Sequence, residues 1–456
     1  MAEVLPIDTP TLGDRSYLAH DGENALVIDP QRDIDRVTAL ADAEGVRITH
    51  VAETHMHNDY LTGGLALSRA VGASYLVNAA DPVRFDRTPV SDGDEIRISG
   101  SLGLRVIATP GHTFSHLSYA LAAGGQVTGV FTGGSLLYGS TGRTDLLGPE
   151  HAEALARAQH ASAHRLARDL PEATPLYPTH GFGSFCAATE PGTRSSTIGQ
   201  EKRSNPALTL GVQAYVETLL AGLDTWPAYY AHMGPANLAG PGAPDLSPPE
   251  PADPATLRRR IEAGEWVVDL RDRTAFAAGF LPGSVCFSLD GSFASYLGWV
   301  IPWGSPVTLL GETPAQIRQA QLELARIGFD RLAGAATGRP EDWAGGQPLA
   351  TLRRVTFRDL AAVIGGTGND GAPVVLDVRR RLEWADGHIT GAVHIPLHEL
   401  PRRLADVPAG EVWVHCGAGY RAVAAASLLA AAGRPAVSVD DEFGNAAEAG
   451  LAITRS

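Results

Sequence analysis

The sequence has few cysteines, no long apolar run and a shortage of positive charge, and each absence excludes a class of protein. Three cysteines in 456 residues are too few for a disulfide framework, which favours a reducing cytoplasm. No apolar run reaches the roughly 18 residues of a membrane helix, and residues 1–15 lack the pattern of a secretory signal. The formal net charge of −15 argues against nucleic acid as the main partner. We therefore expect a cytoplasmic protein that binds neither membranes nor nucleic acids.

The overall composition is that of a globular protein. Hydrophobic residues make up 44% of the chain and charged residues 19%, and a chain of this length predicts roughly two to four domains. The clearest boundary is the stretch 233–253, whose prolines and glycines disfavour a helix or a central strand. We interpret it as a linker between an N-terminal domain, residues 1–232, and a C-terminal half.

The C-terminal half repeats itself. The segment VVDLRDRTAFAAGFLPGSVCFSL resembles VVLDVRRRLEWADGHITGAVHIPL, and Asp269 aligns with Asp377 at an offset of 108 (377 − 269). Each copy begins with a helical stretch, followed by a short β-branched run that ends in an acid. This alternation is typical of α/β domains with parallel sheets. We expect two such domains, at residues 254–345 and 352–456.

Strand-like and helix-like patterns also alternate in the N-terminal half. Apolar residues on both sides of the polar turn 21–24 predict two strands, and the apolar spacing over 31–43 predicts a helix. A further apolar run, 48–52, ends in the polar cluster 54–60. The mixture favours a layered α/β sandwich.

The polar cluster contains closely spaced groups that can bind a metal. His55, His57 and Asp59 alternate directly after the apolar run, and His112 and His180 lie in glycine-flanked settings further along the chain. Imidazoles and carboxylates are the usual protein ligands of zinc and iron, and a loop at a strand end can bring them together. We predict a metal site that contains His55 and His112, with His57, Asp59 and His180 as further candidates.

These residues resemble the metallo-β-lactamase superfamily, whose signature is Thr-His-x-His-x-Asp-His, and within it the persulfide dioxygenase branch. Three further motifs support the resemblance: Phe131-Thr132-Gly133, Gly142-Arg143-Thr144-Asp145 and TIGQEKRSNPAL at 197–208. The resemblance implies an αββα sandwich that holds one iron(II) through two histidines, here His55 and His112, and one aspartate. It also implies that dioxygen oxidises a low-molecular-weight thiol persulfide to sulfite, with Arg143, Lys202 and Arg203 as contacts for the thiol.

The sequence departs from the family at the aspartate. The motif that begins at Phe131 continues with Gly134 where the family has aspartate, and Tyr60 replaces the last histidine of the signature. Iron could still bind through the two histidines, with water or an anion as a further ligand. Alternatively, His57 could join His55 and His112 in a three-histidine zinc site. Asp145 could also turn towards the metal and replace the missing aspartate ligand, or the domain could be a metal-free scaffold.

A second candidate site is a cysteine between a predicted strand and a predicted helix. The run 412–415 is a buried-strand pattern, and the run 422–432 is rich in alanine and leucine. Between them lies the loop Cys416-Gly417-Ala418-Gly419-Tyr420-Arg421. A thiol at this junction meets backbone N–H groups and the positive end of the helix dipole, which lower its pKa and stabilise an anionic persulfide. Arg421 can fix the loop or meet an anionic substrate.

This loop resembles the Cys-x-x-Gly-x-Arg loop of the rhodanese family, and Asp377-Val378-Arg379 upstream matches that family as well. The resemblance implies that Cys416 accepts a sulfane sulfur and passes it to sulfite or another thiophile. In the preceding repeat Leu310 stands near the place of the cysteine. Because leucine cannot carry a persulfide, we expect that domain to be catalytically silent.

Together the predictions describe an α/β protein, an N-terminal αββα metallo-β-lactamase sandwich followed by two α/β rhodanese-like domains with parallel sheets. This order resembles the persulfide dioxygenase–rhodanese fusions, and it implies persulfide oxidation at iron coupled to sulfur transfer on Cys416. Two alternatives stay open: a zinc-dependent thioester hydrolase similar to glyoxalase II, and a sulfurtransferase with an inactive metallo-β-lactamase-like scaffold. We also expect a homo-oligomer, because layered folds of this kind often pair.

Overall fold

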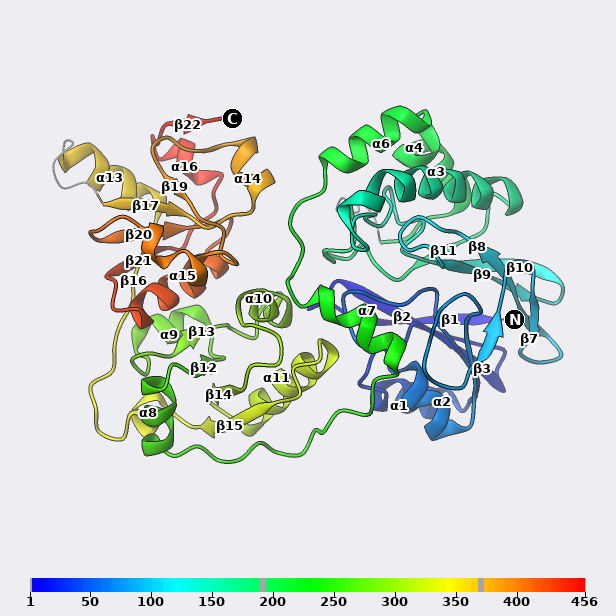
Figure 1. Ribbon diagram of the computed structural model, residues 1–456, viewed down its shortest axis with the longest axis horizontal. Coiled ribbons are helices and arrows are strands. Elements are labelled where there is room, and N and C mark those ends of the chain that lie inside the picture. Colours follow the sequence, from blue (N-terminus) through cyan, green and yellow to red (C-terminus); the bar gives the residue numbers. More distant parts are fainter. Residues whose placement is uncertain (1, 189–193, 368–372, 456) are drawn as a thin grey trace. The chain divides into compact units, whose positions relative to one another are not determined.

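The structure, a computed structural model, describes residues 2–188, 194–367 and 373–455. It divides into two units, Met1–Asp245 with Ala325–Gly328, and Leu246–Leu324 with Phe329–Ser456 (Figure 1). The division after Asp245 falls inside the predicted linker. Among the described residues no helix combines the length and the apolar character needed to cross a bilayer.

Two sheets form the centre of the first unit. The first has the strand order β1-β2-β3-β4-β5-β6, and the second has the order β11-β10-β9-β8-β7. The strands of the first sheet are β1 Glu3–Thr9, β2 Asp14–His20, β3 Asn24–Ile28, β4 Arg47–Ala52, β5 Ser74–Asn78 and β6 Thr88–Val90. Those of the second are β7 Glu95–Arg97, β8 Leu102–Ala108, β9 Leu117–Ala123, β10 Gln126–Gly133 and β11 Leu176–Pro178.

The inner faces of these sheets share one apolar core, and helices cover the outer faces. Leu26 and Ile28 of the first sheet pack in one cluster with Tyr119 and Phe131 of the second. The helices are α1 Asp35–Glu44, α2 Gly64–Val71, α3 Ala152–Asp169, α4 Ile198–Ser204, α5 Pro206–Thr209, α6 Val212–Ala221 and α7 Tyr230–Ala239. In Figure 1, α1 and α2 lie beside the first sheet, and α3, α4 and α6 lie beside the second. The predicted αββα sandwich is confirmed.

Helix α7 corrects the sequence prediction for the start of the linker. The prolines and glycines of 233–253 disfavour a helix, yet α7 continues to Ala239 with Pro235 inside it. Tertiary contacts explain the difference. The fully buried Asn237 donates from Nδ2 to the backbone oxygens of His57 and Tyr60, and its Oδ1 accepts from the Thr62 N–H. These bonds tie α7 to the histidine loop, so tertiary structure overrides local propensity.

The second unit contains two parallel sheets, one in each repeat. The first has the order β13-β12-β14-β15, and the second has the order β16-β21-β20-β17-β19. The first repeat consists of α8 Pro254–Glu262, β12 Trp266–Asp269, α9 Arg273–Ala278, β13 Val285–Cys286, α10 Phe293–Val300, β14 Val307–Gly311, α11 Pro314–Arg326, β15 Leu332–Thr337 and α12 Pro340–Ala344. The parallel pairing confirms the predicted α/β class.

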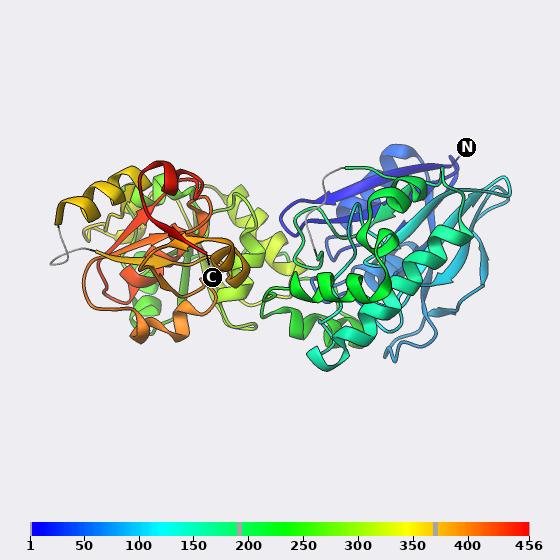
Figure 2. The ribbon, with the colours of Figure 1, turned by 90° about the horizontal axis from the view of Figure 1, so that it is seen from above.

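The second repeat follows the same plan and ends the chain. Its elements are β16 Arg353–Val355, α13 Phe357–Thr367, β17 Val374–Asp377, α14 Arg381–Asp386, β18 His388–Ile389, β19 Val393–His394, β20 Val412–His415, α15 Tyr420–Ala431, β21 Ala436–Val439, α16 Asn445–Glu448 and β22 Ile453–Thr454. Strand β22 pairs with β18, so the C-terminus returns to its own domain (Figure 2). In the first repeat the loop after β14 leads directly into the long helix α11, and in the second repeat the loop after β20 leads into α15. A reactive group in either loop would therefore lie at a helix N-terminus.

Candidate metal centre and reactive cysteine

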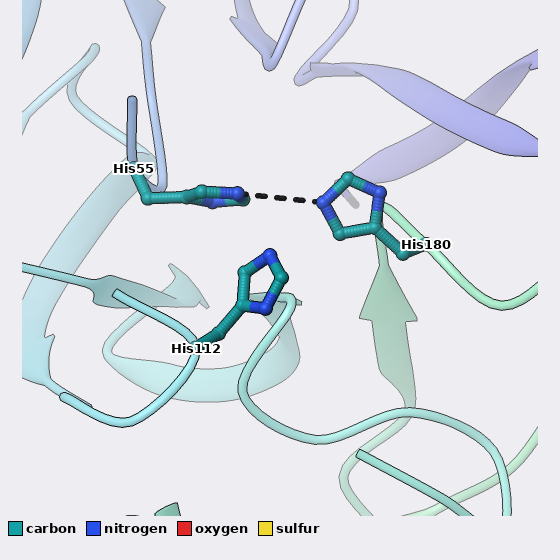
Figure 3. A group of neighbouring side chains, drawn as sticks. All are labelled: His55, His112 and His180. Carbon is teal, nitrogen blue, oxygen red and sulfur yellow. Dashed lines mark hydrogen bonds between the residues drawn. The ribbon is translucent and has the colours of Figure 1, made fainter. Parts of the chain in front are cut away.

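Three histidines from distant parts of the sequence meet at one end of the first unit. His55 follows β4, His112 lies between β8 and β9, and His180 follows β11. Their rings converge in Figure 3, and each of the three residues is at most 1% exposed. Each offers a ring nitrogen, and these nitrogens lie within 4.8 Å of one another. The Nε2 atoms of His55 and His180 are 3.4 Å apart.

Each ring is oriented by a hydrogen bond at Nδ1. His112 Nδ1 donates to the backbone oxygen of Arg143 at 2.7 Å, and His180 Nδ1 donates to Asp14 Oδ1 at 2.9 Å. Thr54 Oγ1 gives its own proton to Asp29, so at 2.9 Å it accepts from His55 Nδ1. Because Nδ1 is engaged by the protein in all three rings, Nε2 is the nitrogen of each ring that is left to bind a metal.

The electrostatics of the three rings differ. Burial lowers the pKa of His55 and brings the pKa of His112 to about 3, so both rings are neutral, the form that binds metals. Burial also opposes the charge of His180, but the carboxylates Asp59 and Asp14 raise its pKa to about 10. A metal at His180 Nε2 would displace a proton.

His57 belongs to a different contact group from the one predicted. Its Nε2 lies 3.3 Å from Asp29 Oδ1, 3.3 Å from Glu53 Oε2 and 3.0 Å from the Tyr60 hydroxyl. Burial disfavours its charge, yet the two carboxylates raise its pKa to about 9. In the described residues the three-histidine group is His55, His112 and His180. His57 groups instead with Asp59 and His180, and also with Asp29 and Glu53.

At position 134 the neighbouring His112 ring leaves room for a glycine but not for a larger residue. A Cβ atom on Gly134 would lie 2.3 Å from His112 Cδ2, which is closer than real side chains approach. The Gly134 N–H donates to His116 Nε2 at 3.0 Å, and its carbonyl oxygen accepts from Gln159 Nε2 at 3.1 Å. Asp145 does not turn into this space, because its carboxylate receives two 2.7 Å bonds from Arg143.

His116 is a further histidine of this site that the sequence interpretation missed. It is buried, its ring stacks on His55 with centroids 4.9 Å apart, and its Nδ1 contacts Thr109 Oγ1. The available signal was its spacing of four residues from His112, which alone does not separate a supporting histidine from a ligand.

Of the three residues predicted to contact the thiol, one is buried and two are exposed. Arg143 is 4% exposed and donates to Asp145 and to the backbone oxygens of Phe185 and Asp224, so it braces the loops around the centre. Lys202 pairs with Glu172 at 2.7 Å on the surface, and Arg203 is exposed. Their role in substrate binding stays a prediction.

Cys416 lies at the predicted junction of strand and helix. It directly follows β20 and is 1% exposed, and its Sγ accepts a 3.1 Å hydrogen bond from the Gly419 N–H. Gly419 has φ 90°, and a Cβ there would overlap Asp440 Oδ1, so the loop requires glycine at this position. Gly417, Ala418 and Tyr420 complete the curl, and α15 begins at Tyr420.

Arg421 forms a two-point ion pair rather than pointing freely at a substrate. Its Nη1 and Nη2 donate to the two carboxylate oxygens of Glu383 at 2.6 and 2.7 Å. Burial works against the charge of Glu383, but Arg421 lowers its pKa to about 2. The pair ties the reactive loop to α14, which fits the predicted loop-fixing role of Arg421.

The strand register shows which residue of the preceding repeat corresponds to Cys416, one position after Leu310. Asp269 pairs with Leu310 on β14, and Asp377 pairs with His415 on β20. Leu310 is therefore the equivalent of His415, and Gly311 occupies the position of Cys416. The physical reason is that the repeats differ in length between the two strands, so the offset drops from 108 to 105 (416 − 311).

The silent repeat braces the reactive loop. The Tyr420 hydroxyl donates to the Ser288 backbone oxygen at 2.9 Å, and Arg273 on α9 bonds Asp440 at 2.9 Å. Tyr296 and Trp299 of α10 line a small cavity together with Arg421. The silent domain thus contributes one wall beside the cysteine loop.

Comparisons with known proteins find relatives of both halves of the chain. The rhodanese-like domain family matches residues 362–442. The human persulfide dioxygenase ETHE1 is 30% identical over 217 residues, which cover 46% of this chain and 75% of that protein. A hydroxyacylglutathione hydrolase of Cereibacter sphaeroides is 31% identical over 230 residues, covering 46% of this chain and 88% of that protein.

Among solved structures, a metallo-β-lactamase from Staphylococcus aureus superposes with a TM-score of 0.66 at 27% identity, covering 74% of this chain and 99% of that one. That coverage is larger than the 46% covered by either relative, so the structural likeness extends further along this chain. The chain belongs to the metallo-β-lactamase superfamily, in the group that contains persulfide dioxygenases and hydroxyacylglutathione hydrolases, and it is a persulfide dioxygenase–rhodanese fusion.

Proposed function

We propose that this protein is an enzyme of persulfide metabolism with two reaction centres. The histidine cluster holds a metal at which a low-molecular-weight thiol persulfide is oxidised, and Cys416 transfers sulfane sulfur. One observation carries the proposal: a single chain holds both a buried group of converging imidazole nitrogens and a thiol that accepts a hydrogen bond from a loop N–H. A persulfide suits both centres, because its terminal sulfur binds metals as an anion and is open to attack by a thiolate.

The residues of the first centre fit a metal. His112 Nε2 is buried without a hydrogen-bond partner among the described residues, which is costly unless an ion uses its lone pair. His55 and His112 would hold the ion, and iron(II) would supply a redox centre with open coordination positions. The surrounding residues exclude water and keep both rings neutral.

The overall oxidation balances without a further reactant. Persulfide, dioxygen and water give thiol, sulfite and two protons, while four electrons pass from the outer sulfur to dioxygen. The sulfite produced is itself a thiophile, so the first centre supplies an acceptor for the second.

Sulfur transfer at Cys416 proceeds by two displacements. The Cys416 thiolate attacks the outer sulfur of R–S–S⁻, the S–S bond of the substrate breaks, and the thiolate R–S⁻ leaves. The new persulfide on Cys416 is then attacked by sulfite, which gives thiosulfate and regenerates the thiolate. The Gly419 N–H and the N-terminus of α15 stabilise the anionic sulfur in both states.

A second candidate function is thioester hydrolysis at zinc. The observation that favours it is the ligand set, because three imidazoles without a carboxylate are typical of catalytic zinc. The hydroxyacylglutathione hydrolase relative points in the same direction. The rhodanese-like domain has no evident part in such a reaction, so persulfide chemistry explains more of the chain.

The test measures metal and reaction together. Full-length protein is purified anaerobically, its iron and zinc are determined by elemental mass spectrometry, and glutathione persulfide is added while oxygen uptake and sulfite are followed. We expect near-stoichiometric iron and oxygen uptake that His55→Gln abolishes. Zinc without oxygen uptake, together with hydrolysis of a glutathione thioester, would contradict the oxidation proposal and support the hydrolase.

A further inference from the structure

We infer that one divalent metal is held by the Nε2 atoms of His55, His112 and His180, so that His180 replaces the carboxylate ligand implied for the family. The inference rests on the proposed metal centre and specifies its ligands. Position 134, where the family's aspartate would stand, is Gly134. A Cβ at this position would lie 2.3 Å from Cδ2 of the His112 ring, so a side chain there could reach the ion only if that ring moved away.

The spacing of the imidazole nitrogens fits a shared ion. Two nitrogens that each lie about 2.1 Å from one metal are about 3.0 to 3.4 Å apart, depending on the coordination angle. His55 Nε2 and His180 Nε2 are 3.4 Å apart, and His112 contributes the third nitrogen within the same 4.8 Å group. The three rings reach this arrangement from three separate loops, with every Nδ1–H already bonded to the protein.

Two acids beside His180 supply the negative charge that a carboxylate ligand would have provided. Three neutral imidazoles leave the full double charge of the ion in a buried site, which is unfavourable unless acids lie nearby. His180 Nδ1 lies 2.9 Å from Asp14 Oδ1 and 3.2 Å from Asp59 Oδ2. Both acids are buried, so their negative charge reaches the ion through the His180 ring, as in carboxylate–histidine–metal triads.

The second group of candidate ligands shares His180 and has to be distinguished from the first. His57 and Asp59 group with His180, whereas His55 and His112 do not belong to that set. His57 Nε2 is engaged by Asp29, Glu53 and Tyr60, so only its Nδ1 could serve. His112 therefore reports on the first group alone, and His57 reports on the two groups that exclude His55 and His112, namely this second group and the group Asp29, Glu53 and His57.

The experiment titrates cobalt(II) into metal-free full-length protein under anaerobic conditions and follows the visible absorption of the bound ion. The variants are His180→Gln, His112→Gln and His57→Gln, which remove one buried ring each. We expect one cobalt per chain in the native protein and a loss of more than about 100-fold in affinity for His180→Gln and His112→Gln, since even supporting residues contribute about 10- to 100-fold. His57→Gln should keep affinity within about tenfold of native. Circular dichroism of the metal-free proteins checks that each variant folds.

The outcomes separate this inference from the proposed function. Native affinity in His180→Gln, with loss in His112→Gln, would overturn the role of His180 while leaving persulfide oxidation testable at a two-histidine site. Loss in His57→Gln with retention in His112→Gln would move the ion to a group that contains His57 and overturn the inference. A native protein that folds but binds neither cobalt nor iron would overturn both proposals. Gly134→Asp adds a second measurement: if this substitution raised the cobalt affinity of His180→Gln, the carboxylate position would be usable and the inference wrong.

Discussion

The two rhodanese-like repeats share a scaffold but differ in the loop that carries the chemistry. In each, an aspartate at the end of a central strand pairs with an arginine two residues on, Asp269 with Arg271 and Asp377 with Arg379, both at 2.6 Å. Each arginine also donates to a glycine carbonyl at the end of the following helix, 2.8 Å to Gly279 and 2.7 Å to Gly387. These matching bonds hold the strand end and the next turn in both repeats.

The reactive features occur in only one repeat. The active repeat has Cys416 after β20 and the Glu383–Arg421 pair. In the silent repeat Gly311 stands at the position of Cys416, and Ala275 stands at the position of Glu383. The buried Asp–Arg pair therefore stabilises the fold whether or not the domain is catalytic. The Glu–Arg pair accompanies the cysteine, which indicates that it serves the loop. The two repeats thus keep the same fold, although the cysteine and its Glu–Arg pair are present in one of them.

The largest effect expected from this comparison is the loss of the nucleophile. Cys416→Ser should reduce sulfur transfer from a persulfide to sulfite by at least about 1000-fold, because a hydroxyl cannot carry sulfane sulfur. Cys286→Ser is the matched control in the silent repeat. Burial raises the pKa of the Cys286 thiol well above its usual range, so it stays protonated and unreactive, and its replacement should leave transfer within about twofold. Thiosulfate formation measures both. Equal losses in the two variants would mean that the repeats are not divided as described.

A smaller effect is expected from the ion pair of the active repeat. Glu383 has a folded-state pKa of about 2, below the ordinary value of 4.5, so its charge stabilises the fold at pH values above 4.5. That contribution is lost as the pH falls from about 4.5 towards 2. Glu383→Gln should destabilise the protein by about 1 to 3 kcal/mol at pH 7. The deficit should shrink in acid.

Urea unfolding of the full-length protein, followed by tryptophan fluorescence at several pH values, measures this deficit. Glu399→Gln is the control in the same domain, because the side chains of the Glu399–Arg403 pair are 41% and 40% exposed, more than those of the Glu383–Arg421 pair, and such a pair is worth at most about 1 kcal/mol. A Glu383→Gln deficit that stays constant between pH 7 and pH 3 would contradict the electrostatic account. In that case the side chain would act through packing.

The comparison also indicates what the sequence could and could not predict. The αββα fold and the strand–loop–helix around Cys416 followed from motifs in which neighbouring residues act together. The grouping of His180 with His55 and His112 did not, because the positions of His57 and His180 depend on contacts with Asp29, Glu53 and Asp14, and no motif connects these acids with the histidines. Helix α7 was missed for the same reason, since Asn237 is held by bonds to residues about 180 positions away.

The smallest effect expected is that of restoring a cysteine to the silent repeat. In a Cys416→Ser background, Gly311→Cys should give no measurable sulfur transfer, although only the Ile317 side chain and its neighbour Gln316 would have to give by a few tenths of an ångström. The silent loop runs three positions from Gly311 to the first residue of α11, Pro314, whereas the active loop runs four from Cys416 to Tyr420. A shorter loop cannot curl as the active loop does, Pro314 has no N–H to offer, and Glu312 adds a negative charge beside the sulfur. Iodoacetamide labelling would show whether the new thiol is accessible, so that absence of transfer can be assigned to chemistry. Recovery of transfer would mean that the nucleophile alone separates the two repeats.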